Sequence, residues 1–117
     1  MEQEDKDLLL LDLCSRLPYE VKIQYEDNIF TIDYISAMYE EIKLNTPNKY
    51  TIDVLEVKPY LFPLSSMTEE QKEDMIKSSC GIGSDKNVFD WFNKNHFDYR
   101  RLIPMGLAID ATGLNIY

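Results

Sequence analysis

The chain has 117 residues, a length typical of one domain built around one modest hydrophobic core. Its 12% aromatic content argues against intrinsic disorder, which goes with few aromatic residues. A formal net charge of −9 repels phosphate backbones, so a DNA or RNA polymer is not expected as a partner.

The start of the chain is acidic, and the apolar run at residues 8–11 is far too short to cross a membrane. We therefore expect no signal peptide and no membrane partner. Cys14 and Cys80 are the two cysteines, and Cys14 lies in an apolar run where a free cysteine usually acts as a small buried hydrophobe. A reduced protein in the cytoplasm is the expected state, although the two cysteines could pair.

Residues 4–17 are predicted to form a helix that ends before Pro18. Acidic residues at its start and Arg16 at its end suit the helix dipole. Its wide apolar face is formed by Leu8, Leu9, Leu11, Leu13 and Leu17.

The next part of the chain has the two-residue period of half-buried strands. Residues 21–25 and 29–35 are predicted to form a hairpin around a tight turn at Asp27 and Asn28, which both tolerate left-handed backbone angles. Further strands are predicted at residues 38–44 and 50–57. Four short strands joined by tight turns indicate an antiparallel meander, either a curled sheet or a small SH3-like barrel, with the first helix as its cover.

Pro59 and Pro63 bracket a segment that we expect to be extended and to leave the sheet. Thr68 and Gln71 have the spacing of a capping box, which predicts a polar surface helix over residues 69–79. A second helix is predicted from Asp85, a short helical turn at residues 98–102, and an extended tail at residues 111–117. The predicted fold is α+β in a single domain, 1–117, with a helix and meander in 1–64 and a helical part in 65–117.

The sequence shows no recognisable catalytic or metal-binding constellation. It has one histidine, His96, and its two cysteines are far apart, so neither a metal site nor a cofactor is expected. Cys80 and His96 could in principle form a nucleophilic pair, but such a site also needs an orienting group and an oxyanion hole. The glycine-containing loop at residues 81–86 follows a helix and lacks the third glycine of a dinucleotide fingerprint and the Gly-Lys-Ser/Thr of a P-loop.

Residues 86–101 form the most unusual segment, because cations are concentrated there in an acidic chain and aromatic residues lie between them. Aromatic faces stack on bases and arginine forks bind phosphate, so this mixture suits a nucleotide-like anion. The alternative is a core helix with inward-packed aromatic residues and solvated charges. The residues concerned are Lys86, Lys94, Arg100 and Arg101 with Trp91, His96, Phe97 and Tyr99.

Four stretches carry a family resemblance: DLCSRLPY at 12–19, VKPYL at 57–61, PLSSMTEE at 63–70 and DWFNKNHFDYR at 90–100. With Leu-Ile at 102–103 and Gly-Leu-Ala at 106–108, they resemble a family of small uncharacterised proteins carried by phages, prophages and mobile elements of Bacteroides and related gut bacteria. The chain departs from the family pattern at Glu20 and Arg101, where glycine is expected, and at Phe62, where arginine is expected.

The resemblance implies a bacterial host cell but no particular activity. Short, accessory, non-enzymatic phage proteins often act on host defence, and by analogy we expect such a role here. One hypothesis is a protein that sequesters a nucleotide immune signal without cleaving it, in a pocket that small domains often build at a homo-oligomer interface. The alternatives are an acidic module that binds and inhibits a host protein, and a small nucleotide hydrolase that uses His96. The candidate binding residues, which could equally be fold determinants, are Lys58, Tyr60, Ser65, Ser66, Trp91, His96, Tyr99, Arg100 and Arg101.

Overall fold

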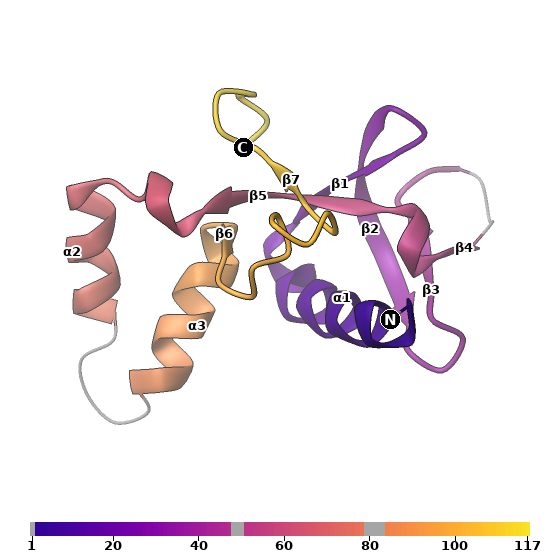
Figure 1. The fold of residues 1–117 in the computed structure, drawn as a ribbon, viewed down its shortest axis with the longest axis horizontal. Helices are drawn as coiled ribbons and strands as arrows, with labels where there is room; N and C mark the ends of the chain where they lie inside the picture. Colours follow the sequence, from indigo (N-terminus) through magenta and orange to yellow (C-terminus); the bar gives the residue numbers. More distant parts are fainter. Residues whose placement is uncertain (1, 48–50, 79–83) are drawn as a thin grey trace.

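A computed structural model describes residues 2–47, 51–78 and 84–117 of the chain. It shows an α+β fold with an N-terminal helix, a mixed sheet and C-terminal helices (Figure 1). The elements are α1 (Glu2–Arg16), η1 (Leu17–Tyr19), β1 (Lys22–Tyr25), β2 (Asn28–Ser36), β3 (Glu41–Leu44), β4 (Thr51–Asp53), η2 (Val54–Glu56), β5 (Lys58–Pro63), η3 (Leu64–Ser66), α2 (Glu69–Ser78), α3 (Ser84–Lys94), β6 (Phe97–Asp98) and β7 (Ile109–Asp110).

The first four strands form the predicted antiparallel meander, with neighbours in the order β4-β3-β2-β1. Tyr25 pairs with Asn28, so the hairpin turn consists of Glu26 and Asp27, one residue earlier than predicted. Both turn residues have positive φ, 48° and 64°, as a two-residue hairpin turn requires.

The third and fourth strands are shorter than predicted. Strand β3 begins at Glu41, because residues 37–40 form the turn after β2. Strand β4 ends at Asp53, whose carboxylate accepts a hydrogen bond from the Leu55 amide at 2.9 Å and so starts the 3-10 helix η2. Residue 50 lies outside the described residues.

Strand β5 corrects the prediction for the proline-bracketed segment. The segment is extended, but it lies within the sheet: Ile23 of β1 pairs with Pro59 in antiparallel register. On its other side, Phe62 pairs with Phe97 of β6 and Tyr60 with Ile109 of β7, both in parallel. The sheet is therefore mixed, with seven strands in the described chain, and is larger than a four-stranded antiparallel meander or SH3-like barrel.

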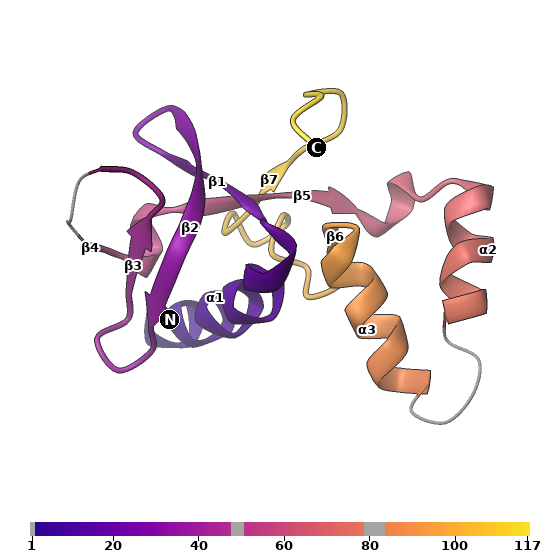
Figure 2. The same cartoon turned by 180° about the vertical axis from the view of Figure 1, so that it is seen from behind.

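Helix α1 lies across one face of the sheet, as both views show (Figures 1 and 2). Its Leu9 and Leu13 are fully buried, whereas Leu11, expected on the same face, is 56% exposed. Cys14 is also exposed, which contradicts its predicted burial. The core that α1 covers includes Val21, Ile23, Ile42, Val54, Leu61 and Leu102.

Helices α2 and α3 form a pair that lies to one side of α1 (Figures 1 and 2). The capping box is confirmed, since the Gln71 amide donates to the Thr68 hydroxyl and the Thr68 amide donates to the Gln71 side chain, at 3.2 and 2.8 Å. As predicted, α2 is a surface helix without buried residues. It is joined to α3 by a hydrogen bond of 2.7 Å from the Trp91 indole to the Asp74 carboxylate. None of the described helices has the length and apolar character that a membrane crossing requires.

The end of the chain differs from the prediction in two places. Residues 98–102 are not helical: Asp98 ends β6, and its carboxylate accepts hydrogen bonds from the amides of Leu102 and Ile103, each at 2.9 Å. Residues 111–117 are not an extended tail. They turn after β7, so that Tyr117 packs back on the sheet and on His96.

The resemblance places glycine at positions 20 and 101, and both residues have left-handed φ angles here, 55° at Glu20 and 61° at Arg101. A residue other than glycine is strained by about 1–2 kcal/mol in this conformation. Replacement by glycine relieves this strain, but part of the gain in stability is lost because glycine has more conformational freedom in the unfolded chain. We expect Glu20→Gly and Arg101→Gly each to stabilise the protein by about 0.5–1 kcal/mol in urea unfolding. Glu56→Gly, in η2 without a left-handed angle, is the matched control and should destabilise. Destabilisation by all three would show that the two angles carry no strain.

Candidate ligand-binding site

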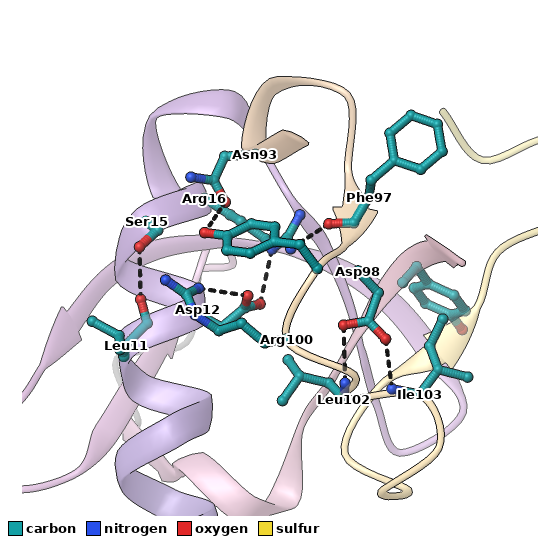
Figure 3. Close-up of polar contacts among 12 residues, drawn as sticks. Leu11, Asp12, Ser15, Arg16, Asn93, Phe97, Asp98, Arg100, Leu102 and Ile103 are labelled. Carbon is teal, nitrogen blue, oxygen red and sulfur yellow. Dashed lines mark hydrogen bonds and ion pairs between the residues drawn. The ribbon is translucent and has the colours of Figure 1, made fainter. Parts of the chain in front are cut away.

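The site begins with a buried ion pair on the inner face of α1. Asp12 and Arg16 are both 0% exposed and lie one helical turn apart. The Arg16 Nε donates to the Asp12 carboxylate at 2.8 Å, and its Nη2 donates to the Phe97 carbonyl at 2.6 Å. This arrangement ties α1 to β6 (Figure 3).

Arg100 brings a second guanidinium to the same carboxylate, at 2.9 Å from its Nη1 to the other Asp12 oxygen. Figure 3 shows Asp12 between the two arginines. Both arginines also lie over the Tyr99 ring, at 4.6 Å for Arg100 and 5.3 Å for Arg16. Two cations thus share one anion, and the buried Nη1 of Arg16 has no hydrogen-bond partner in the described chain.

A cavity of about 710 Å³ opens beside this cluster, between the end of α1 and the side of α3. Its volume falls in the range of small-molecule sites. Phe89, which is 48% exposed, provides an accessible aromatic surface and lies 5.2 Å from the Tyr99 ring. The lining residues are Ser15, Phe89, Asp90, Asn93, Tyr99 and Arg100.

Two of the lining side chains keep unused hydrogen-bond donors. Arg100 uses Nη1 for Asp12, while its Nε and Nη2 make no hydrogen bond within the described residues. Asn93, which is 5% exposed, accepts from the Tyr99 hydroxyl at 3.0 Å through its amide oxygen, and its amide nitrogen has no described partner. The cavity wall therefore offers an arginine edge and an amide N–H to an acceptor.

The structure thus brings Tyr99 and Arg100 together, as the basic–aromatic hypothesis expected, but it places Trp91 elsewhere. Trp91 is 6% exposed, stacks on Phe97 at 5.5 Å and lines a different cavity, of about 500 Å³, between α2 and α3. Lys94 lines that cavity as well. The Trp91 ring belongs to the aromatic packing that connects α3 to the sheet.

His96 and Tyr60 both contact Tyr117 and form a separate group of residues around it. The His96 ring stacks on the Tyr117 ring at 3.7 Å, and the Tyr117 hydroxyl donates to the Tyr60 carbonyl at 2.7 Å and accepts from the Lys22 amide at 2.8 Å. Burial, with the nearby charges of Arg16 and Lys22, lowers the pKa of His96 to about 4. Burial also raises the pKa of Tyr117 to about 12, against the opposing effects of the Lys22 backbone and Arg16.

Lys58, Ser65, Ser66 and Arg101 do not line the cavity. Lys58 is exposed on β5 opposite Gln24, and Arg101 is exposed in the turn after β6. Ser65 is exposed in η3, where the neighbouring Ser66 hydroxyl donates to the Pro63 carbonyl at 2.7 Å. Lys86 lies in α3, and the glycine-containing loop before that helix lies mostly outside the described residues.

The low pKa of His96 predicts a pH-dependent stability. Its pKa is about 4 in the folded protein against 6.5 as the ordinary value, so only the unfolded chain takes up the proton between these limits. Stability should therefore fall as the pH drops from 6.5 to 4, by less than about 1.4 kcal/mol per pH unit because the ring is partly exposed. His96→Asn, which tolerates the local φ of 63°, should remove this part of the loss in urea unfolding. Parallel wild-type and variant curves would contradict the assignment.

Sequence reasoning did not name Asp12, Ser15, Phe89, Asp90 or Asn93 as binding residues. For Asp12, the spacing along the helix could have indicated its burial. Asp12 and Arg16 lie on the same helical face as Leu9 and Leu13, and this face packs toward the core. In the same way, Asn93 lies one turn after Phe89 and shares its face of α3. Arg16 was interpreted only as a partner of the helix dipole.

A third cavity, of about 300 Å³, lies between the two hairpins, and its lining includes Tyr25, Phe30, Leu44 and Ile52. In residues 2–47, 51–78 and 84–117, no group of three or more His, Cys, Asp or Glu side chains is placed to hold a metal ion.

No protein-family model matches the sequence, and comparison with curated proteins and with solved structures gives no match. Functional inference therefore depends on the geometry of the site.

Proposed function

We propose that the protein binds and sequesters a nucleotide-type ligand, without cleaving it, in the cavity between α1 and α3. The observation that carries the proposal is the meeting of Tyr99, Arg100 and Phe89 around one cavity of about 710 Å³. Phe89 offers a surface for a base to stack on, and Arg100 offers donors to a phosphate. With the phage and mobile-element resemblance, this is the behaviour of an anti-defence protein that removes an immune signal in a bacterial host cell.

The geometry supports binding without turnover. His96, the sole histidine, stacks on Tyr117 and does not line this cavity. A pKa of about 4 leaves it neutral near pH 7 and a weak base. Among the lining residues that the structure describes, Asp90 is the one carboxylate, and none of them is a nucleophile paired with its own base.

Thermal unfolding in the presence of nucleotides tests the proposal. The panel comprises cyclic mono-, di- and trinucleotides, linear dinucleotides and ADP-ribose derivatives. A ligand at a hundred times its dissociation constant adds about 2.7 kcal/mol of stability, which is a rise on the order of 10 °C for a domain of this size. Absence of a shift with every member would reject a nucleotide ligand.

Phe89→Ala should abolish or strongly reduce the ligand-induced shift, because it removes the exposed stacking surface. Met105→Ala is the matched control, since Met105 is 49% exposed and does not line the cavity. Chromatography of the ligand after long incubation should return it unchanged. A shift that survives Phe89→Ala would place the ligand elsewhere, and a cleaved ligand would make the protein an enzyme.

A second candidate, an acidic module that inhibits a host protein, is favoured by one surface. Met38 and Tyr39, 83% and 71% exposed, lie in the turn between β2 and β3. The acidic start of α1 is next to this turn, where the Gln3 side chain donates to the Glu40 carboxylate at 2.9 Å. Aromatic and methionine side chains are typical interface anchors. One stoichiometric host protein retained by the wild type and lost by Tyr39→Ser would support this alternative.

A further inference from the structure

The charge balance of the buried cluster beside the cavity indicates how much negative charge a ligand should carry. Asp12, Arg16 and Arg100 together carry one net positive charge, and both Asp12 oxygens already accept hydrogen bonds from the arginines. Arg16 is 0% exposed and still has an unpartnered Nη1 in the described chain. Buried polar groups are normally paired, so the two arginines have more donors than the described acceptors around them take up.

Arg100 is the part of this cluster that a ligand can reach. It lines the cavity, and its side chain is 18% exposed. Asp12 occupies Nη1, whereas Nε and Nη2, which form the lateral edge of the guanidinium, have no hydrogen-bond partner among the described residues. Two parallel N–H groups match two oxygens on one phosphorus. The amide nitrogen of Asn93 provides another donor on the same wall.

In the part of the lining that the structure describes, a second negative charge has no matching cation. Arg100 is the one cation among these described lining residues, which also include the carboxylate of Asp90. The whole chain adds a field of net charge −9, which opposes highly charged anions further.

From this balance we propose that the site selects a phosphodiester, the phosphate form with two non-bridging oxygens and a single charge, over phosphomonoesters and polyphosphates. The proposal rests on the proposed function and names the class of nucleotide. The two non-bridging oxygens face Nε and Nη2 of Arg100, and the single charge is the one that the Arg100 guanidinium can pair with. A phosphomonoester brings a third terminal oxygen and up to two charges at pH 7, and a triphosphate brings still more.

Titration calorimetry with ligands that share one base tests this selection. Adenosine 3′,5′-cyclic monophosphate and the linear dinucleotide ApA carry one diester charge, whereas adenosine 5′-monophosphate and 5′-triphosphate carry more. The same comparison is made with guanine nucleotides at pH 7.5 and low salt. We expect at least one diester of a series to bind at least about tenfold more tightly than the monoester, and the triphosphate to bind most weakly.

Arg100→Lys isolates the guanidinium edge, because it keeps the positive charge and removes the pair of parallel donors. We expect this variant to lose most of the preference for the diester. Lys94→Gln is the control, since Lys94 lines the other cavity and should leave the preference unchanged. Thermal unfolding of each variant confirms that it is folded.

The outcomes separate this inference from the proposed function. Equal or tighter binding of the monoester or triphosphate overturns the diester selection and leaves nucleotide binding standing. A diester preference that survives Arg100→Lys also overturns it, because the guanidinium edge is then not its source. Absence of binding by every nucleotide overturns both proposals.

Discussion

Replacing Asp12 with alanine is expected to destabilise the protein by about 3–5 kcal/mol, because it leaves two arginines without their shared carboxylate. Arg16 is fully buried, so its charge gains little from water when its partner is lost. Urea unfolding monitored by circular dichroism measures the change.

Two further variants show that this loss comes from burial. Lys72→Gln breaks an exposed ion pair with Glu69 on α2 and should change stability by less than about 1 kcal/mol. The double variant Asp12→Leu with Arg16→Met replaces the buried pair by apolar side chains and should recover part of the loss. A cost below 1 kcal/mol for Asp12→Ala would show that the cluster does not hold α1 against β6.

Replacing Phe97 with alanine is expected to cost about 3–5 kcal/mol, the usual loss for a buried phenylalanine. Phe97 is 1% exposed and contacts three aromatic rings, with centroids at 5.5 Å for Trp91, 6.0 Å for Phe62 and 6.5 Å for Phe92. These contacts join α3 to β5, so their loss should loosen the α2–α3 pair first. Tryptophan fluorescence should then report unfolding at lower urea than circular dichroism does.

Phe89→Ala is the matched control, because it removes the same side chain from a half-exposed position on α3. Its cost should stay below about 1 kcal/mol. Similar losses for the two variants would mean that the ring cluster around Phe97 is not a structural centre.

Local patterns were sufficient for the elements whose stability arises from neighbouring residues. The two-residue alternation around Ile23 placed the first hairpin, and the spacing of Thr68 and Gln71 placed the start of α2. Both signals depend on contacts within a few residues, which the chain order shows directly. The exposed Cys14 and Leu11 were mispredicted because α1 is apolar on more sides than the sheet covers.

Long-range pairing decided the role of β5. Its two prolines argued against a sheet strand, since proline lacks an amide donor. The segment nevertheless pairs with β1, and the amide of Phe62 donates to the His96 carbonyl at 2.8 Å. Residues 96 and 111, which hydrogen-bond to β5, follow α2 and α3 in the chain. A prediction from neighbouring residues therefore does not include these partners of β5.

The candidate site divides in the same way. Composition and order along the chain pointed to Tyr99 and Arg100 as residues suited to a nucleotide, and these two line one cavity. Trp91 was a candidate from the sequence and Phe89 was not, but residues two apart face different sides of a helix, and of the two only Phe89 lines that cavity. The acidic surface charge and the α+β class also followed from the amino-acid order. The cluster of Asp12, Arg16 and Arg100 arose only on folding, because Asp12 and Arg100 are 88 positions apart in the chain and meet only in the tertiary structure.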